Sequence, residues 1–217
     1  MTDLLKPVLI MHIVAGTAAL FSGSISIVAE KGLIVHRTSG KVYFWSMLIV
    51  ACTAAIMSLA KDLDFFLMLS MFACYAAYAG YRSIRNKRRR ASILDWLMLC
   101  AALITCASML LSGNLVLTIF GAIFAMLSVN DARDFLKREP LTVRSKRWLV
   151  VHIARMMTAY IATTTAFVVV NVSDAMPQQL NALIWLAPTI VFTPLIFFFI
   201  RKYTGSKQAL LTAAINE

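Results

Sequence analysis

The chain has 217 residues, of which 60% are hydrophobic and 14% are charged, and its mean hydropathy is +0.78. Soluble domains are about 45–50% apolar and about 25% charged, so this composition excludes a soluble enzyme, a disordered chain and a disulfide-stapled secreted domain. The formal net charge of +11 is unexpected here, because a membrane chain has to keep its charges out of the hydrocarbon.

The apolar residues fall into seven stretches that approach the length of about 20 residues needed to cross a bilayer as a helix. None shows the alternation typical of barrel strands, so we predict an all-α, polytopic membrane protein. In chain order, the predicted spans are about residues 7–28, 42–60, 65–81, 93–111, 115–131, 148–172 and 183–200. The fifth stretch has the shortest apolar part, and its helix is expected to continue past Asp131. Six spans plus one interfacial helix is the alternative. No linker interrupts the spans, which predicts one seven-helix domain over residues 1–217.

Basic residues alternate between the two sides of this arrangement. The side of the N-terminus carries only Lys6 and Lys61, whereas the other side carries eighteen Lys and Arg, and Arg155 alone lies inside a span. By the positive-inside rule, we expect the N-terminus outside and the C-terminus in the cytoplasm. The basic run at residues 85–90 is interpreted as an anchor for anionic lipid headgroups, and no nucleic-acid partner is expected.

The first predicted helix carries a face of small residues with an ionisable residue at each end. Its members are His12, Gly16, Ala19, Gly23, Ser26 and Glu30. Small side chains let another helix approach closely in lipid, so this face predicts helix packing. His12 and Glu30 are separated by about 27 Å along the helix and cannot share a site. His12 is expected to be neutral and hydrogen-bonded, and both residues are kept as additional functional candidates.

The second helix is predicted to open within the segment from His36 to Tyr43, with Thr38 or Ser39 as its N-terminal cap. The start of a helix favours anions, and His36, Arg37 and Lys41 add positive charge there. The segment therefore predicts either a site for a phosphate, a carboxylate or a haem propionate, or a basic anchor for lipid headgroups.

A polar cluster is predicted at the cytoplasmic boundary, where helix five ends and helix six begins. Arg155 lies about two turns inside helix six and should pair with an acid, for which Asp131 is nearest in depth. The candidate site residues are His36, Arg37, Asp131, His152 and Arg155, with Tyr43 and Tyr160 as additional candidates. Of these, His36, Asp131 and His152 are also candidate metal ligands.

Several of these segments resemble a bacterial family of predicted membrane proteins, domain of unknown function 2306. The matching stretches run from His12 to Gly23, from His36 to Tyr43, and from His152 through Tyr160 to Thr189. The resemblance implies a multi-pass protein of the bacterial inner membrane, in contact with the lipid bilayer. It implies no reaction.

Three functions remain open from the sequence. A ligand-binding, lipid-binding or accessory membrane protein requires the fewest special residues. A b-type haem redox protein is suggested because His36 and His152 lie at similar depth on different helices, as axial haem ligands do. A membrane-embedded zinc hydrolase would use His36, His152 and Asp131 as ligands, with water in the open position. No cofactor and no catalytic residue is assigned from the sequence.

Overall fold

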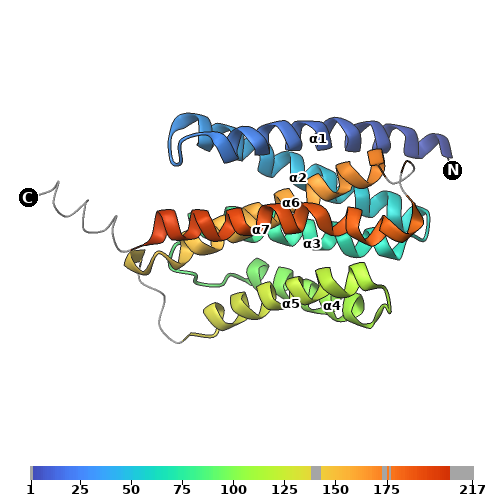
Figure 1. Cartoon of the computed structure of the whole chain (residues 1–217). Coiled ribbons are helices and arrows are strands. Elements are labelled where there is room, and N and C mark those ends of the chain that lie inside the picture. Colours follow the sequence, from blue (N-terminus) through green and yellow to red (C-terminus); the bar gives the residue numbers. More distant parts are fainter. Residues whose placement is uncertain (1, 138–142, 173–174, 176, 206–217) are drawn as a thin grey trace, which may run out of the picture.

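The computed structural model describes residues 2–137, 143–172, 175 and 177–205. Over these residues the chain forms seven α-helices and no strand, which confirms the all-α prediction (Figure 1). The helices are α1 (Thr2–Val28), α2 (Ile34–Ala60), α3 (Asp64–Arg85), α4 (Ile93–Leu111), α5 (Leu115–Phe135), α6 (Arg147–Val172) and α7 (Asn181–Thr204).

Most helix boundaries follow the apolar stretches, but α2 differs. α4 covers residues 93–111 as predicted, and α5 continues past Asp131 to Phe135. α2 begins at Ile34, well before residue 42, because Gly32 makes the turn after α1 with a φ of 86°. Glycine adopts this left-handed conformation without steric cost, so the helix starts directly after the turn. The predicted cap at Thr38 or Ser39 is therefore wrong, since both residues lie inside α2.

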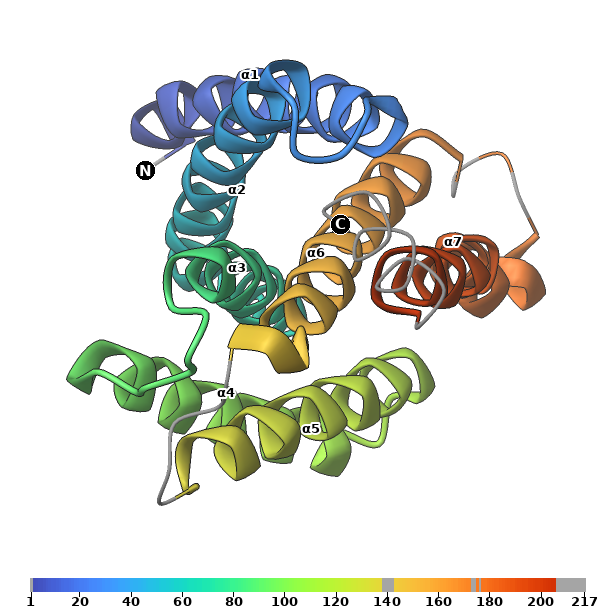
Figure 2. The ribbon, with the colours of Figure 1, turned by 90° about the vertical axis from the view of Figure 1, so that its left-hand side faces the viewer.

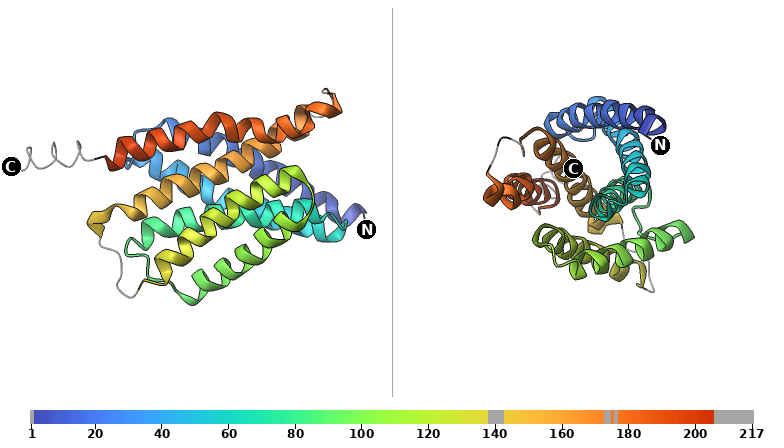
Figure 3. Two further views of the ribbon diagram at one scale, coloured as in Figure 1. Left: turned by 60° about the horizontal axis from the view of Figure 1, so that its bottom comes forward. Right: turned by 90° about the vertical axis from the view of Figure 1, so that its right-hand side faces the viewer.

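Consecutive helices run in opposite directions and form one bundle (Figures 1 and 3). Viewed along its axis, α3 and α6 occupy the middle, with α1 and α2 on one side and the α4–α5 hairpin on the other (Figure 2). α3 packs against α2, α4 and α6, and α6 packs in addition against α1 and α7. The central pair α3 and α6 therefore joins the two outer pairs.

The buried apolar residues form two clusters on opposite sides of α3. One joins α3 to the hairpin through residues such as Phe72, Leu99 and Phe124. The other joins α3 to α1, α2 and α6 and includes Tyr43 and Tyr160. Two polar sites lie beside these clusters, toward the end of the bundle that carries the α1–α2 connection.

Six of the described helices are long and apolar enough to cross a membrane. They are Leu5–Val28, Ile34–Ala60, Ile93–Leu111, Leu115–Phe135, Arg147–Val172 and Asn181–Thr204. α3 is not among them, and its buried residues include Ser70, Tyr75 and Ser83. A helix that other helices surround requires fewer apolar side chains than one that faces lipid, which accounts for the composition of α3.

Candidate functional site

His36 and His152 meet between α2 and α6. Their ring centroids are 6.4 Å apart and the ring planes are nearly perpendicular, at 86°. His36 lies in the first turn of α2 and His152 in the second turn of α6, and both side chains are partly buried. The structure therefore brings together two of the histidines that the sequence placed at one depth. We call them the histidine pair.

Each imidazole of the histidine pair is oriented by a backbone carbonyl of a different helix. His36 Nδ1 lies 3.0 Å from the carbonyl oxygen of Ser26 in α1, and His152 Nδ1 lies 3.0 Å from that of Gly80 in α3. A carbonyl oxygen can only accept, so each Nδ1 carries the proton and donates it. In a neutral imidazole the Nε2 atom then keeps its lone pair. Neither Nε2 has a hydrogen-bond partner among the described residues.

Tyr43 and Tyr160 form a second level, about two turns deeper on the same two helices. Their ring centroids are 6.2 Å apart, and the Tyr160 hydroxyl lies 2.7 Å from Oγ of Ser24 in α1. The Tyr43 hydroxyl is buried and has no hydrogen-bond partner among the described residues. The additional candidates Tyr43 and Tyr160 therefore lie deeper than the histidine pair on the same two helices, and of the two hydroxyls only that of Tyr160 is hydrogen-bonded within the described part of the chain.

Two glycines allow the close packing around these residues. A Cβ atom at Gly23 would lie 2.6 Å from the Tyr160 ring, and one at Gly80 would lie 2.8 Å from Met156 Sδ and 3.0 Å from its backbone nitrogen. Gly23 belongs to the small face predicted on the first helix, and Ala19 on that face is fully buried. The packing role of this part of the face is confirmed.

Asp131 is the centre of a second polar site, between α5, α6 and the α3–α4 connection. Its Oδ2 accepts hydrogen bonds from the Tyr75 hydroxyl at 2.7 Å and from Arg155 Nη2 at 2.9 Å, and its Oδ1 accepts one from Arg89 Nη2. Arg155 also donates to the Leu127 carbonyl at 2.6 Å. The predicted pairing of Arg155 with Asp131 is confirmed, and both side chains are almost fully buried.

A second acid extends this site toward the end of the bundle. Asp134 Oδ2 lies 2.9 Å from Arg147 Nε and 3.4 Å from Arg89 Nε, and its Oδ1 lies 3.6 Å from Lys137 Nζ. We call Tyr75, Arg89, Asp131, Asp134, Arg147 and Arg155 the ion-pair cluster. Its two acids face three arginines, so each acid is paired and the cluster keeps one positive charge in excess.

The structure thus divides the predicted cluster into two sites. Asp131 is held by the ion-pair cluster and is not brought together with His36 and His152. The described residues contain no group of three or more His, Cys, Asp or Glu side chains placed to hold a metal ion. The three-ligand set of the zinc-hydrolase hypothesis is therefore not assembled.

The remaining candidates lie outside both sites. His12 Nδ1 lies 2.9 Å from Thr53 Oγ1, so the expected hydrogen bond of His12 is confirmed. The side chains of Glu30 and Arg37 are exposed at the α1–α2 connection. The predicted anion site depended on a helix start near Ser39, but Ser39 donates from within α2 to the Val35 carbonyl at 2.7 Å.

Lys31 lies next to the histidine pair in the α1–α2 connection. Its ammonium donates to the carbonyls of Ser26, Ile27 and Ala29 and so satisfies the end of α1. Burial lowers the pKa of Lys31, and the nearby charge of Lys202 lowers it further. Because the Ser26 carbonyl accepts from both Lys31 and His36, the position of the His36 ring depends on how α1 ends.

Arg89 is the residue that the sequence interpretation missed. It belongs to the basic run at residues 85–90, yet it is only 4% exposed and adopts a left-handed φ of 59°. Its guanidinium lies 5.0 Å from the Phe135 ring centroid as well as against both acids.

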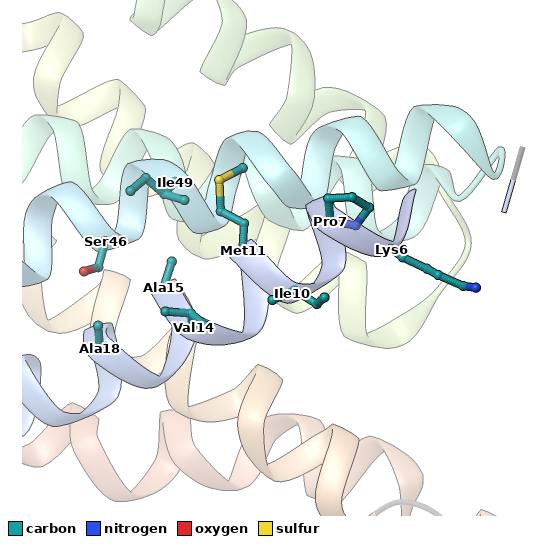
Figure 4. A pocket seen from close by; sticks show the side chains of 9 residues that line it. All are labelled: Lys6, Pro7, Ile10, Met11, Val14, Ala15, Ala18, Ser46 and Ile49. Atoms are coloured by element: carbon teal, nitrogen blue, oxygen red, sulfur yellow. The ribbon is translucent and has the colours of Figure 1, made fainter. Parts of the chain in front are cut away.

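A groove of about 780 Å³ lies elsewhere, between α1 and α2 (Figure 4). α1 contributes residues from Lys6 to Ala18, and α2 contributes Ser46 and Ile49. The lining is mostly apolar and includes none of the predicted site residues. The groove is therefore separate from the histidine pair, which lies toward the other end of α1.

The comparison with protein families identifies the chain. The family described as "Predicted membrane protein (DUF2306)" matches residues 9–134, which is more than half of the chain. The chain belongs to this family, which confirms the resemblance seen in its sequence from His12 to Tyr43. The stretch from His152 to Thr189 lies outside the matched residues. No curated protein and no solved structure matches the chain.

Proposed function

We propose that this DUF2306 protein is a binding or accessory protein of the bacterial inner membrane, with its ligand site at the histidine pair. The proposal includes seven spans, an outer N-terminus and a cytoplasmic C-terminus. The site then lies at the cytoplasmic boundary, where basic side chains face anionic lipid headgroups.

The orientation is supported by the distribution of charge. Seven antiparallel helices leave the beginning of α1 and the end of α7 at opposite ends of the bundle (Figure 1). Among the described residues, Lys6 and Lys61 lie at the end where α1 begins, whereas most Lys and Arg residues, from Lys31 to Lys202, lie at the end where α7 finishes. Counting α3 as a span is required for this alternation, since six crossings return both ends of a chain to the same side.

The observation that carries the proposal is the state of the two imidazoles. Both Nδ1 atoms are engaged by backbone carbonyls, so both Nε2 lone pairs are presented from neighbouring helices without a partner among the described residues. Neither Nε2 belongs to the buried polar atoms that lack a partner in the described part of the chain, so both are accessible to a molecule that reaches the pair. A bound ligand supplies that partner.

The binding test uses the full chain purified from membranes in mild detergent. In a His→Asn variant, the new amide takes the place of Nδ1 and keeps the carbonyl contact, while the Nε2 lone pair is lost. We expect native mass spectrometry to show a bound species in the wild type, its loss in the double variant His36→Asn/His152→Asn, and its retention in the control His12→Asn. A species retained equally by all three proteins, or no species at all, contradicts the proposal.

The topology is tested separately with reporter fusions after Thr204 and before Leu5. An alkaline phosphatase fused after α7 should be inactive, and a fluorescent protein at the same place should fold and fluoresce. The opposite pattern at this end contradicts the orientation without affecting the ligand site.

A further inference from the structure

The ligand of the histidine pair can be narrowed from the chemistry of its two donors, an inference that rests on the binding role proposed above. We infer that the pair binds one transition-metal centre through Nε2 of His36 and Nε2 of His152. The metal is either a bare ion or the iron of a haem.

The first argument is the anchoring of both rings. Histidines that ligate a metal almost always donate their other ring nitrogen to a carboxylate, a carbonyl or a water, which fixes the tautomer and the ring orientation. Here both Nδ1 atoms lie 3.0 Å from carbonyl oxygens, one from α1 and one from α3. His36 Nδ1 lies in addition 3.1 Å from Ser26 Oγ, so two atoms of Ser26 hold this ring in place.

The second argument is the separation of the rings. A metal–imidazole bond is about 2.0 Å long and the ring centroid lies about 1 Å behind the nitrogen, so two rings on opposite sides of one ion have centroids about 6 Å apart. The observed separation is 6.4 Å, which matches this spacing when the two Nε2 atoms face each other. Perpendicular ring planes are compatible with this arrangement, because rotation about a metal–nitrogen bond leaves its length unchanged.

The third argument is the donor set. Imidazole suits copper, zinc, iron and nickel. The described residues provide no third His, Cys, Asp or Glu at this place, so the remaining ligands must come from water, a bound molecule or a porphyrin. A porphyrin occupies four positions and leaves two opposite ones, which is the number that the histidine pair fills.

The charges on the elements around the pair are compatible with either form of the metal. The cations Lys31 and Arg37 are closest along the chain, and Lys31 is occupied by the carbonyls at the end of α1. Asp131, the buried acid of the next site, is bound by Arg89 and Arg155. The two neutral imidazoles are therefore the groups that bind the metal. Because they carry no negative charge, the positive charge of the metal is offset only by a porphyrin or a small anion.

The test loads the detergent-purified full chain with Cu²⁺, Zn²⁺ or haemin in separate titrations. We expect stoichiometric binding of at least one of them, with affinity reduced at least about tenfold in His36→Asn and in His152→Asn. His12→Asn, which leaves the pair intact, should bind as the wild type does. A Soret band with haemin identifies haem iron, whereas binding of Cu²⁺ or Zn²⁺ without a Soret band identifies a bare ion.

A second test uses spectroscopy of the wild-type protein, so it does not depend on the folding of a variant. In wild-type protein loaded with Cu²⁺ or haemin, electron paramagnetic resonance should show two equivalent imidazole nitrogens on the metal. Absence of tight binding by all three probes, or binding that the Asn variants share, overturns the metal inference. If a non-metal species is nevertheless lost in the double variant, the proposed binding role stands and only its metal is wrong.

Discussion

The ion-pair cluster and the histidine pair lie toward the same end of the bundle, but they differ in how their polar atoms are satisfied. Both oxygens of Asp131 accept hydrogen bonds, from three side chains on three different segments. In the histidine pair only the Nδ1 atoms are engaged, and the Nε2 atoms have no partner among the described residues. In the first site both acids are paired, and among the described residues only Arg89 Nε is buried there without a hydrogen-bond partner. In the second site the two Nε2 atoms are accessible and, within the described part of the chain, unpaired.

This difference separates stability from binding. A buried charge is costly when it is unpaired, so residues of a complete network are retained even if they never meet a ligand. Incomplete polar atoms contribute little to folding and are available for recognition. We therefore expect substitutions in the ion-pair cluster to change stability strongly, and substitutions in the histidine pair to change binding with little effect on stability.

The largest effect is expected for Asp131→Asn. The substitution keeps the shape of the side chain but leaves Arg89 and Arg155 buried without their shared counter-charge, which costs about 3–5 kcal/mol. Unfolding in detergent, followed by circular dichroism, measures the loss. The control is Asp62→Asn, at an exposed residue whose left-handed φ of 52° asparagine accepts. If both variants were equally stable, Asp131 would not hold the cluster together.

A smaller loss is expected for Tyr75→Phe. The hydroxyl of Tyr75 donates to Asp131 at 2.7 Å, and a hydrogen bond to a charged group contributes about 1.5–3 kcal/mol. Tyr81→Phe is the matched control. The ring of Tyr81 stacks on Phe44 with its centroid 3.9 Å away, and its hydroxyl makes no contact with the ion-pair cluster. Equal unfolding midpoints for the two variants would show that the Tyr75 hydroxyl is not part of the stabilising network.

Gly80→Ala tests the packing beneath the histidine pair without removing a histidine. The new methyl would lie 2.8 Å from Met156 Sδ and 3.0 Å from the Met156 backbone nitrogen, so α3 and α6 must separate, at a cost of about 1–3 kcal/mol. Because the Gly80 carbonyl orients His152, ligand affinity should fall as well.

Gly16→Ala is the control for this substitution. The nearest atom to a Cβ at Gly16 is Val50 Cγ2 at 4.0 Å, which is ordinary contact. Since alanine has a higher helix propensity than glycine, this variant should be as stable as the wild type or up to about 1 kcal/mol more stable. If Gly16→Ala lost as much stability as Gly80→Ala, the close approach of Met156 to Gly80 would not explain the loss.

The smallest effect on stability is expected for the double variant His36→Asn/His152→Asn. Asparagine retains a donor for each carbonyl, so the free energy of unfolding in the absence of ligand should fall by less than about 1 kcal/mol. The unfolding midpoint of ligand-loaded protein should fall much further, because the variant loses the stabilisation that binding adds. A large loss already without ligand would place the histidines with the ion-pair cluster as structural residues.

The sequence was sufficient for the elements that depend on apolar runs and charge counts. Each of the seven described helices contains one of the predicted apolar stretches or most of it, and the pairing of Arg155 with Asp131 follows from the cost of an unpaired charge at that depth. The start of α2 was misplaced because two hydroxyl residues resembled a cap, whereas Gly32 set the turn earlier. Local cap chemistry is weaker evidence than a backbone conformation that only the fold reveals.

The division of the predicted cluster into two sites was beyond the sequence. His152 and Arg155 are three residues apart on α6, and depth alone assigns them to one place. The structure separates them because His152 contacts α3 at Gly80 and Arg155 contacts α5 at Leu127 and Asp131. Arg89 was missed for a related reason, since nothing in a run of basic residues shows which one folds back into the bundle.

The composition of α3 has a consequence for how the protein is made. Tyr75, Tyr78 and Arg82 find their partners on α4 and α5, in Asp131 and Asp95, and Gly80 receives its hydrogen bond from α6. These partners are all synthesised after α3. In the seven-span arrangement, α3 therefore enters the bilayer before its polar groups are satisfied. We expect its final insertion to wait for α4 to α6, so that nascent chains truncated before residue 115 leave α3 exposed to protease.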